Sequence, residues 1–396
     1  MRASWDNLFV FLLAGLGALT GTSAYRPGLD RSVEMQIDAL MLTVSKPSDP
    51  GFAVLVKQGP KVIFLKGYGV REFGQSAKIE SNVNFRLASV TKQFTAMAVM
   101  LLVRDGRLRY EDHLTDIWPD FPAYGSTITV RELLTHTSGL PDYENLMETE
   151  EKAHGPKWSA EKQITDREVL DLLKAQTSGV FPPGTKWEYS NSGYVVLGLI
   201  VTKVSGESYG EFLQKRIFAP SGMKNTVVYE KGKNQVVDRA YGHTKQGETF
   251  PVTDQSSTSA TLGDGGIYSN VEDLANWDDG LTHRTLLSRE ELSLAWTAAT
   301  MADGSPYLWP NGKNDGPPHA VAYGFGWFLD PYKGHPREYH DGESIGFRST
   351  IERYPKDNLT IIILSNRTDI SPRDLGEKIA DILFAAAHGS WVASRV

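Results

Sequence analysis

Hydrophobic residues recur with two different periods along the chain, and each change of period marks a predicted element. The first predicted helix covers residues 31–43, where apolar side chains follow helical spacing at Val33, Ile37, Leu40 and Met41. Two short β-rich runs come next, 52–56 and 62–65. The segment between them, Gln58-Gly59-Pro60-Lys61, is typical of a turn, so the two runs are predicted to form a hairpin.

The middle of the chain has the helical period. One helix is predicted from Phe94 to Leu102, a second from Val169 to Leu173 and a third from Tyr194 to Val204. Connections rich in Pro, Gly and Trp, over 117–126 and 181–187, separate these segments. This part of the chain is therefore predicted to be mainly helical.

Strand patterns return near the carboxyl end, over 323–329, 348–354 and 359–364, followed by a last helix over 375–386. Strands at both ends with helices between them predict one sheet that is built from both termini and flanked by helices. The predicted fold class is α/β in the mixed α+β sense. Its sheet domain is expected over 25–92 and 300–396, with a mainly helical domain inserted over 93–299.

The first residues have the order of a secretory signal peptide. Arg2 precedes an apolar stretch from Leu8 to Leu19, and Thr22-Ser23-Ala24 then supplies small residues for cleavage. The apolar run is about 12 residues long, whereas a bilayer span needs about 20. An N-terminal core helix is the alternative, which Asp6 favours slightly. We expect residues 1–24 to be removed and the mature chain to be exported, periplasmic or secreted, without a membrane span.

Composition narrows the possible chemistry. The chain has 396 residues, 40% of them hydrophobic, and 41 Lys and Arg against 48 Asp and Glu give a net charge of −7. Such a mildly acidic chain without basic runs is not expected to bind nucleic acid. There is no cysteine, which excludes disulfide scaffolds and cysteine nucleophiles. The nine histidines show no metal-ligand spacing, so neither a metal nor another cofactor is expected.

A serine and a lysine on one helical turn form the first candidate motif, Ser89-Val90-Thr91-Lys92. A lysine three positions after a serine shares its helix face, and it can accept the hydroxyl proton if its pKa falls. The helix N-terminus adds positive potential for a developing oxyanion. The same spacing occurs in 159–162 and 221–224, but only Ser89 precedes a strongly apolar helix, so the other two are predicted to lie in surface loops.

Tyr189-Ser190-Asn191 is the second candidate motif. A tyrosine beside an ammonium is stabilised as phenolate and can act as a general base, and Asn191 can donate to a substrate carbonyl. The segments 143–145 and 268–270 repeat the Tyr-x-Asn pattern, and an isolated match is more often a turn with a packed tyrosine.

The third candidate motif is His340-Asp341-Gly342, between two strand patterns. A cationic or hydrogen-bonding residue followed by glycine fits an active-site edge strand, where substrate approaches the backbone. The N–H of Glu343 is then placed to form an oxyanion hole with that of Ser89. A competing pattern overlaps it, because residues 342–346 match the Gly-x-Ser-x-Gly nucleophile elbow around Ser344. That elbow requires a helix afterwards, whereas the residues after Gly346 have a strand pattern.

In this order the three motifs resemble the serine β-lactamase and penicillin-binding-protein superfamily, in the class C and D-alanyl-D-alanine carboxypeptidase branch that includes esterases of the same fold. The resemblance extends over residues 30–388 and includes the phrases at 133–140, 183–185 and 265–269. It implies a β-lactamase/transpeptidase-like fold. It also implies a nucleophile at Ser89, a lysine at Lys92, a tyrosine base at Tyr189 and an amide-binding Asn191, with His340 as the basic residue of the third motif.

One position departs from this family. The middle of the third motif is usually Thr or Ser, whose hydroxyl helps to bind a substrate carboxylate, and here it is Asp341. An anion at this position is expected to repel such a carboxylate, although Arg348 could compensate.

The resulting expectation is an exported serine hydrolase that forms an acyl-enzyme on Ser89 and hydrolyses an amide or ester, as a D-Ala-peptide carboxypeptidase or a β-lactamase-like enzyme. Lys92 and Tyr189 share the proton transfer, while Asn191, His340, Asp341, Gly342 and Glu343 contact the substrate. A carboxylesterase of the same fold is the alternative that Asp341 favours. A non-catalytic cell-wall or ligand-binding protein is a further alternative. The expected partner is a small-molecule or peptide substrate.

Overall fold

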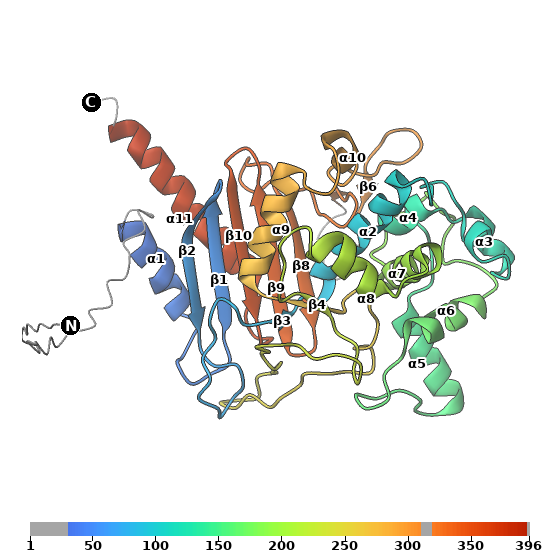
Figure 1. Ribbon diagram of the computed structural model, residues 1–396, viewed down its shortest axis with the longest axis horizontal. Helices are drawn as coiled ribbons and strands as arrows, with labels where there is room; N and C mark the ends of the chain where they lie inside the picture. Colours follow the sequence, from blue (N-terminus) through green and yellow to red (C-terminus); the bar gives the residue numbers. More distant parts are fainter. Residues whose placement is uncertain (1–30, 310–318, 394–396) are drawn as a thin grey trace, which may run out of the picture.

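The main sheet of the protein is antiparallel and has five strands, which come from both ends of the chain (Figure 1). The computed structural model describes residues 31–309 and 319–393, so the predicted signal peptide lies outside the described residues. The strand order is β2 (Lys61–Tyr68), β1 (Phe52–Gln58), β10 (Leu359–Ser365), β9 (Phe347–Tyr354) and β8 (Glu338–Ser344). The hairpin β1–β2 and the sheet of both termini confirm the predicted fold class.

Helices cover both faces of this sheet. On one face, α1 (Arg31–Leu42) and α11 (Pro372–Ala393) pack on Phe52, Val54 and Val56 of β1. The intervening Ala53 and Leu55 belong to the larger core on the opposite face, where α9 (Val271–His283) crosses β1 and β10 (Figure 1). A strand that is buried on both faces reads as a continuous apolar run, and this explains the sequence of β1.

The mainly helical part of the chain lies beside the edge strand β8 (Figure 1). Its two central helices are α2 (Lys92–Arg104), which follows the 3-10 turn η1 (Ala88–Thr91), and α7 (Asn191–Ser205), which packs against α2. The other elements here, most of them short, are α3 (Leu114–Ile117), η2 (Ala123–Thr127), α4 (Val130–Leu134), α5 (Tyr143–His154), α6 (Asp166–Lys174), α8 (Tyr209–Leu213), η3 (Gln214–Phe218) and α10 (Arg289–Ser293).

Two minor sheets complete the fold. The first has the order β3 (Phe85–Arg86), β5 (Ile267–Ser269) and β4 (Val227–Val228), and the second pairs β6 (Tyr307–Leu308) with β7 (Ala320–Val321). The first of these sheets leads directly into the Ser89 turn. Across residues 31–309 and 319–393, no helix has both the length and the apolar content for a membrane crossing.

The predicted strand over 323–329 is wrong. This segment makes only isolated bridges at Tyr323 and Phe328, and it turns back on itself through a hydrogen bond from Gly324 N to Trp327 O at 2.9 Å. Gly326 has φ +81°, and an added Cβ would lie 2.9 Å from the carbonyl oxygen of Lys92. Gly326 therefore allows this segment to lie directly against the backbone of α2. The fifth strand of the sheet is β8 instead.

Candidate active site

Ser89 and Lys92 occupy one turn at the junction of η1 and α2. Lys92 Nζ lies 3.1 Å from Ser89 Oγ, which is hydrogen-bond distance. The preceding residue, Ala88, has φ +49°, a left-handed conformation that non-glycine residues rarely adopt. The strained backbone and the buried helix together fix where the Ser89 hydroxyl lies.

Lys92 is fully buried, and its surroundings do not neutralise it with a carboxylate contact. Its Nζ also donates to Asn191 Oδ1 at 2.8 Å and to the main-chain oxygen of Asp264 at 3.1 Å. Burial lowers the pKa of Lys92 to about 8, against the opposing effect of the nearby charges of Asp264, Glu144 and Asp142. About one tenth of this lysine is therefore uncharged at pH 7, and this neutral form can act as the proton acceptor that serine requires.

Tyr189 lies over the same ammonium, with its ring centroid 4.8 Å from Lys92 Nζ. Burial raises the pKa of Tyr189 well above its ordinary value, and a hydrogen bond with Ser89 opposes this only in part. The phenolate form expected from the sequence is therefore disfavoured. The geometry instead places a neutral phenol hydroxyl at the nucleophile, where it can pass a proton on.

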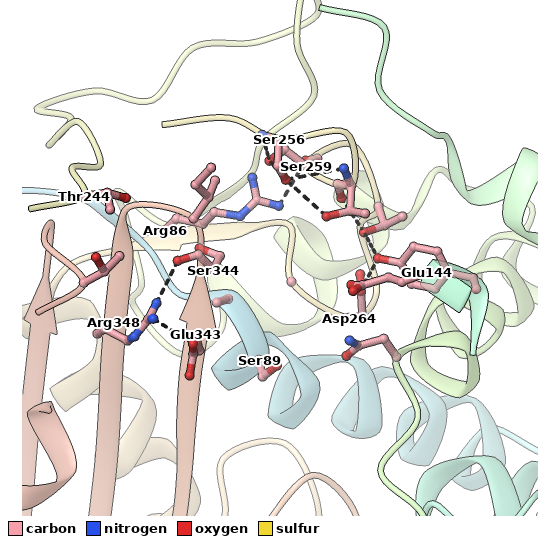
Figure 2. A pocket seen from close by; sticks show the side chains of 18 residues that line it. Arg86, Ser89, Glu144, Thr244, Ser256, Ser259, Asp264, Glu343, Ser344 and Arg348 are labelled. Atoms are coloured by element: carbon pink, nitrogen blue, oxygen red, sulfur yellow. Dashed lines mark hydrogen bonds and ion pairs between the residues drawn. The ribbon is translucent and has the colours of Figure 1, made fainter. Parts of the chain in front are cut away.

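Ser89 opens into a cavity of about 460 Å³ with a polar lining (Figure 2). Asn191, the first residue of α7, borders it on one side, and Glu343, at the end of β8, borders it on the other. Ser190 caps α7 by accepting a hydrogen bond from Gly193 N at 3.0 Å, which fixes the position of Asn191. The lining of the cavity thus includes the predicted nucleophile, the predicted amide-binding residue and one predicted oxyanion donor.

His340 differs from the expectation of a cation in contact with substrate. It is buried, it is not among the residues that line the cavity, and its Nε2 pairs with the hydroxyl of Tyr323 at 3.1 Å. Burial and the charge of Lys92 lower the pKa of His340 to about 3, so it is neutral near pH 7. Its ring centroid lies 6.1 Å from that of Tyr189, behind the tyrosine.

Asp341 lies beside α11 and forms a pair with Arg373, 3.2 Å from Nη1 to Oδ2. Its other oxygen accepts a hydrogen bond from Thr350 Oγ1 at 2.7 Å. Burial raises the pKa of Asp341, while the charge of Arg373 opposes the rise. The anion expected to repel a substrate carboxylate is thus already neutralised by a cation. Arg348, the residue expected to compensate, donates to Glu343 Oε1 at 2.7 Å.

Gly342 lies close to the protein backbone at Leu87, whereas the sequence predicted a close approach of substrate. An added Cβ would lie 2.0 Å from Leu87 O and 2.2 Å from Ser349 Oγ. Ser349 Oγ donates to the same Leu87 oxygen at 2.7 Å, which ties β9 to the segment before Ser89. The edge of the sheet and the Ser89 turn are held together at this glycine. The oxyanion hole from the N–H groups of Ser89 and Glu343 stays a prediction.

Three residues at the site were not singled out from the sequence. His136 is buried with φ +61°, its ring centroid lies 4.3 Å from that of Tyr189, and its Nδ1 accepts a hydrogen bond from Ser190 N at 3.1 Å. Asp264 lines the cavity and accepts a hydrogen bond from Tyr143, which lies in one of the rejected Tyr-x-Asn matches. The sequence signal for His136 was its position inside the segment 133–140, which resembles a phrase of the family. The Tyr-x-Asn match was the available signal for Tyr143, although an isolated match is more often a turn. No motif marked Asp264, because contacts this distant in sequence are set by the fold.

The competing motifs do not form alternative sites. Ser159 lies in a loop and Ser221 in the turn after η3, and neither serine begins a helix as Ser89 does. Ser344 ends β8, and β9 begins at Phe347, so a strand follows where the nucleophile elbow requires a helix. Within the described part of the chain, no group of histidine and acidic side chains has the arrangement of a metal site.

Comparison with known proteins agrees with this arrangement. The family model for beta-lactamase matches residues 42–386. The chain belongs to the beta-lactamase family. It is 31% identical over 347 residues to penicillin-binding protein 4* of Bacillus subtilis, covering 84% of this chain and 72% of that protein. It is also 27% identical to protein flp of Staphylococcus aureus, of which the match spans 64%.

Solved structures of this family have the same fold. An octameric penicillin-binding protein homologue from Pyrococcus abyssi is 26% identical, with a TM-score of 0.72 over 89% of this chain and 77% of that chain. The D-amino acid amidase of Ochrobactrum anthropi, complexed with L-phenylalanine amide, is 23% identical, with a TM-score of 0.73 over 90% of this chain and 98% of that chain. These likenesses show that the chain shares the fold of these proteins.

Proposed function

We propose that this protein is a serine hydrolase that forms an acyl-enzyme on Ser89 and hydrolyses an amide or ester substrate. The observation that carries the proposal is the contact of 3.1 Å between Ser89 Oγ and a fully buried Lys92 whose pKa is lowered to about 8. Keeping a buried lysine charged without a carboxylate partner costs free energy. Its deprotonated form is the base that the serine of a Ser-x-x-Lys motif needs.

The proposed reaction uses the two neighbours of Ser89. Neutral Lys92 takes the hydroxyl proton as Ser89 Oγ attacks the substrate carbonyl, and the N–H groups of Ser89 and Glu343 stabilise the oxyanion. The proton then passes through the neutral Tyr189 hydroxyl to the leaving amine or alcohol as the scissile bond breaks. Water attacks the acyl ester by the reverse proton path, which releases the acid and restores Ser89. Asn191 donates to a carbonyl of the bound substrate.

The substrate class is proposed from the charges around the third motif. A D-Ala-peptide carboxypeptidase or a β-lactamase-like enzyme fits the motif set and the penicillin-binding relatives. A carboxylesterase is the second candidate, because Arg373 and Arg348 are already paired with Asp341 and Glu343 and an ester without a carboxylate needs neither. A structural neighbour titled EstCE1, a hydrolase with promiscuous acyltransferase activity, has this fold at 20% identity.

Export is also proposed, on the order of charged, apolar and small residues in the segment 1–24. Expression of the full chain with fractionation and N-terminal sequencing tests it. A mature chain outside the cytoplasm that begins at Tyr25 is the expected result, whereas an intact Met1 in the cytoplasm would refute it.

Turnover of three substrates tests the proposed function. Purified protein is compared with Ser89→Ala on p-nitrophenyl butyrate, nitrocefin and a D-Ala-D-Ala peptide. The proposal expects turnover of at least one substrate that Ser89→Ala abolishes, and the substrate that is turned over fastest assigns the class. Failure of all three, and of penicillin and activated esters to acylate the protein, would instead favour the non-catalytic binding protein.

A further inference from the structure

Most buried cations in the described part of the chain have a carboxylate partner. Besides Lys92, five Lys or Arg residues are buried in the described part of the chain, and four of them form ion pairs: Lys57 with Asp278 and Asp279, Arg337 with Glu352 and Glu377, Arg353 with Asp278 and Glu338, and Arg367 with Asp369. Arg86 is the fifth. It is 4% exposed and makes no ion pair with a described residue. A guanidinium cannot lose its proton, so Arg86 stays charged. This buried charge therefore has no ion-pair partner among the described residues.

Arg86 lines the same cavity as Ser89 (Figure 2). It ends strand β3, three residues before the nucleophile, and its Nη2 donates to the main-chain oxygen of Ser259 at 3.0 Å. Its Nε and Nη1 are buried without any hydrogen-bond partner. Figure 2 shows the guanidinium beside Ser256 and Ser259, on the side of the cavity where Ser344 and Arg348 lie.

Two further unpartnered atoms lie in the same lining, Ser344 Oγ and Asp264 Oδ1. Both are buried and have no hydrogen-bond partner. Buried polar groups of native proteins are normally satisfied. The two unsatisfied donors, Arg86 and Ser344, therefore point to a ligand group that accepts hydrogen bonds, while Asp264 Oδ1 requires a donor on the same ligand. The other cation of the lining, Arg348, is already paired with Glu343.

We propose that Arg86 anchors an anionic group of the substrate, of the carboxylate class, while Ser89 attacks the carbonyl. This inference rests on the proposed function and deepens it, because it specifies a substrate with an acidic group near the scissile bond. The proposed anchor, Arg86, lies on β3. The third motif does not offer a free cation, because Arg373 forms an ion pair with Asp341 there. The carboxylate belongs either to the acyl part or to the leaving group of the substrate.

Matched ester pairs distinguish these two sources. For the acyl side, p-nitrophenyl hemiglutarate is compared with p-nitrophenyl valerate, and for the leaving group, 4-carboxyphenyl butyrate is compared with phenyl butyrate. A charge-assisted anchor is expected to give the acidic member of one pair an advantage of roughly tenfold or more in kcat/KM. Arg86→Gln should remove this advantage and change the neutral ester less than about threefold. Arg86→Lys should retain part of it, since an ammonium keeps the charge without the planar fork.

The control variant is Arg239→Gln, which removes a largely buried arginine that pairs with Asp254 and does not line the cavity. It should leave the preference for the acidic ester unchanged. An equal preference for both members of each pair in the unaltered protein would overturn the proposal. So would an equal loss on acidic and neutral esters in a folded Arg86→Gln protein, since that result indicates a purely structural arginine.

Equilibrium binding separates this proposal from the proposed function. N-phenylglutaramic acid and N-phenylpentanamide are titrated into Ser89→Ala protein and into Ser89→Ala/Arg86→Gln protein. Tighter binding of the acid that requires Arg86 supports the anchor even if no ester is turned over, in which case only the hydrolase proposal fails. Equal binding of the two compounds to Ser89→Ala protein, together with equal binding of the leaving-group pair 4-butyramidobenzoic acid and N-phenylbutanamide, overturns the anchor, whatever the activity of Ser89.

Discussion

The proton of Ser89 has one neighbouring acceptor whose pKa lies near neutrality. The pKa of Lys92 is lowered to about 8 by burial, whereas burial raises that of Tyr189 well above its ordinary value. The active form of the free enzyme is therefore the one with neutral Lys92. Because this form grows as pH rises, kcat/KM on a neutral ester is expected to increase with pH and to level off above an apparent pKa near 8.

Lys92→Gln should remove this rising limb and lower kcat by about 10²- to 10⁴-fold, the usual contribution of a general base. Tyr189→Phe is the comparison, because it should lower kcat while the limb near pH 8 persists. Rate profiles between about pH 5 and 10 measure both. A limb that vanishes in Tyr189→Phe and survives in Lys92→Gln would reverse the two roles.

Asp341 gives a second prediction for a single residue. Asp341→Thr removes the carboxylate that pairs with Arg373 and restores the hydroxyl that the family usually has at this position. The freed guanidinium should bind a substrate carboxylate, so acylation by penicillin is expected to become faster by roughly tenfold, as one charge-assisted hydrogen bond provides. Intact-mass measurements over time follow the acylation, and p-nitrophenyl butyrate serves as the neutral control. An unchanged penicillin rate with normal ester turnover would contradict this account.

Strand β8 joins the sheet to the Ser89 turn, and Gly342 is the point of contact. In Gly342→Ala, the new Cβ would overlap Leu87 O at 2.0 Å and Ser349 Oγ at 2.2 Å. We expect a loss of about 1–3 kcal/mol in the free energy of unfolding, together with a lower acylation rate. Gly210→Ala in α8 is the control, because its nearest neighbour, Val228 Cβ, is 3.4 Å from the added carbon. Urea unfolding and ester turnover of both variants test the contact, and wild-type behaviour of Gly342→Ala would refute it.

Elements with strong apolar periodicity were predictable from that pattern, whereas the polar edge strand β8 was expected only from the His340-Asp341-Gly342 motif. β1 and β10 are buried runs with a clear hydrophobic signal, and β9 mixes aromatic and β-branched residues with polar ones, whereas β8 has the sequence Glu-Tyr-His-Asp-Gly-Glu-Ser. Its residues are fixed by pairing with β9 and by contact with the Ser89 turn, neither of which leaves an apolar pattern. The aromatic segment 323–329 was predicted as a strand from its hydrophobic residues. In the structure these residues pack in a glycine-containing turn instead.

At the scale of the whole molecule, the order of strands and helices predicted a sheet shared by both termini with helices inserted between them. The chemistry predicted from the motifs comes together at the edge of that sheet, where Ser89, Lys92 and Asn191 are in contact. Charge states were beyond the sequence, because the neutral His340 and the Asp341–Arg373 pair depend on burial and on partners from other elements. The domain boundaries at 25–92, 93–299 and 300–396 stay a prediction.

The buried apolar residues of the C-terminal helix should stabilise the whole protein without taking part in the reaction. Ile379 of α11 is fully buried against the sheet face that lies away from Ser89, next to Val54 and Ile363. Ile379→Ala should lower the free energy of unfolding by about 2–5 kcal/mol and leave the KM of the folded enzyme unchanged. The exposed neighbour Lys378 is the control, and Lys378→Ala should change stability by less than about 0.5 kcal/mol. Equal stability of the two variants in urea would contradict the packing.

The central claim is that Ser89 is the nucleophile, and covalent labelling tests it most directly. Intact protein, Ser89→Ala and Ser344→Ala are treated with a fluorophosphonate, and the mass of each protein and of its peptides is measured. This account predicts one adduct on the peptide that contains Ser89, present in Ser344→Ala and absent from Ser89→Ala. An adduct that persists in Ser89→Ala and disappears in Ser344→Ala would contradict it.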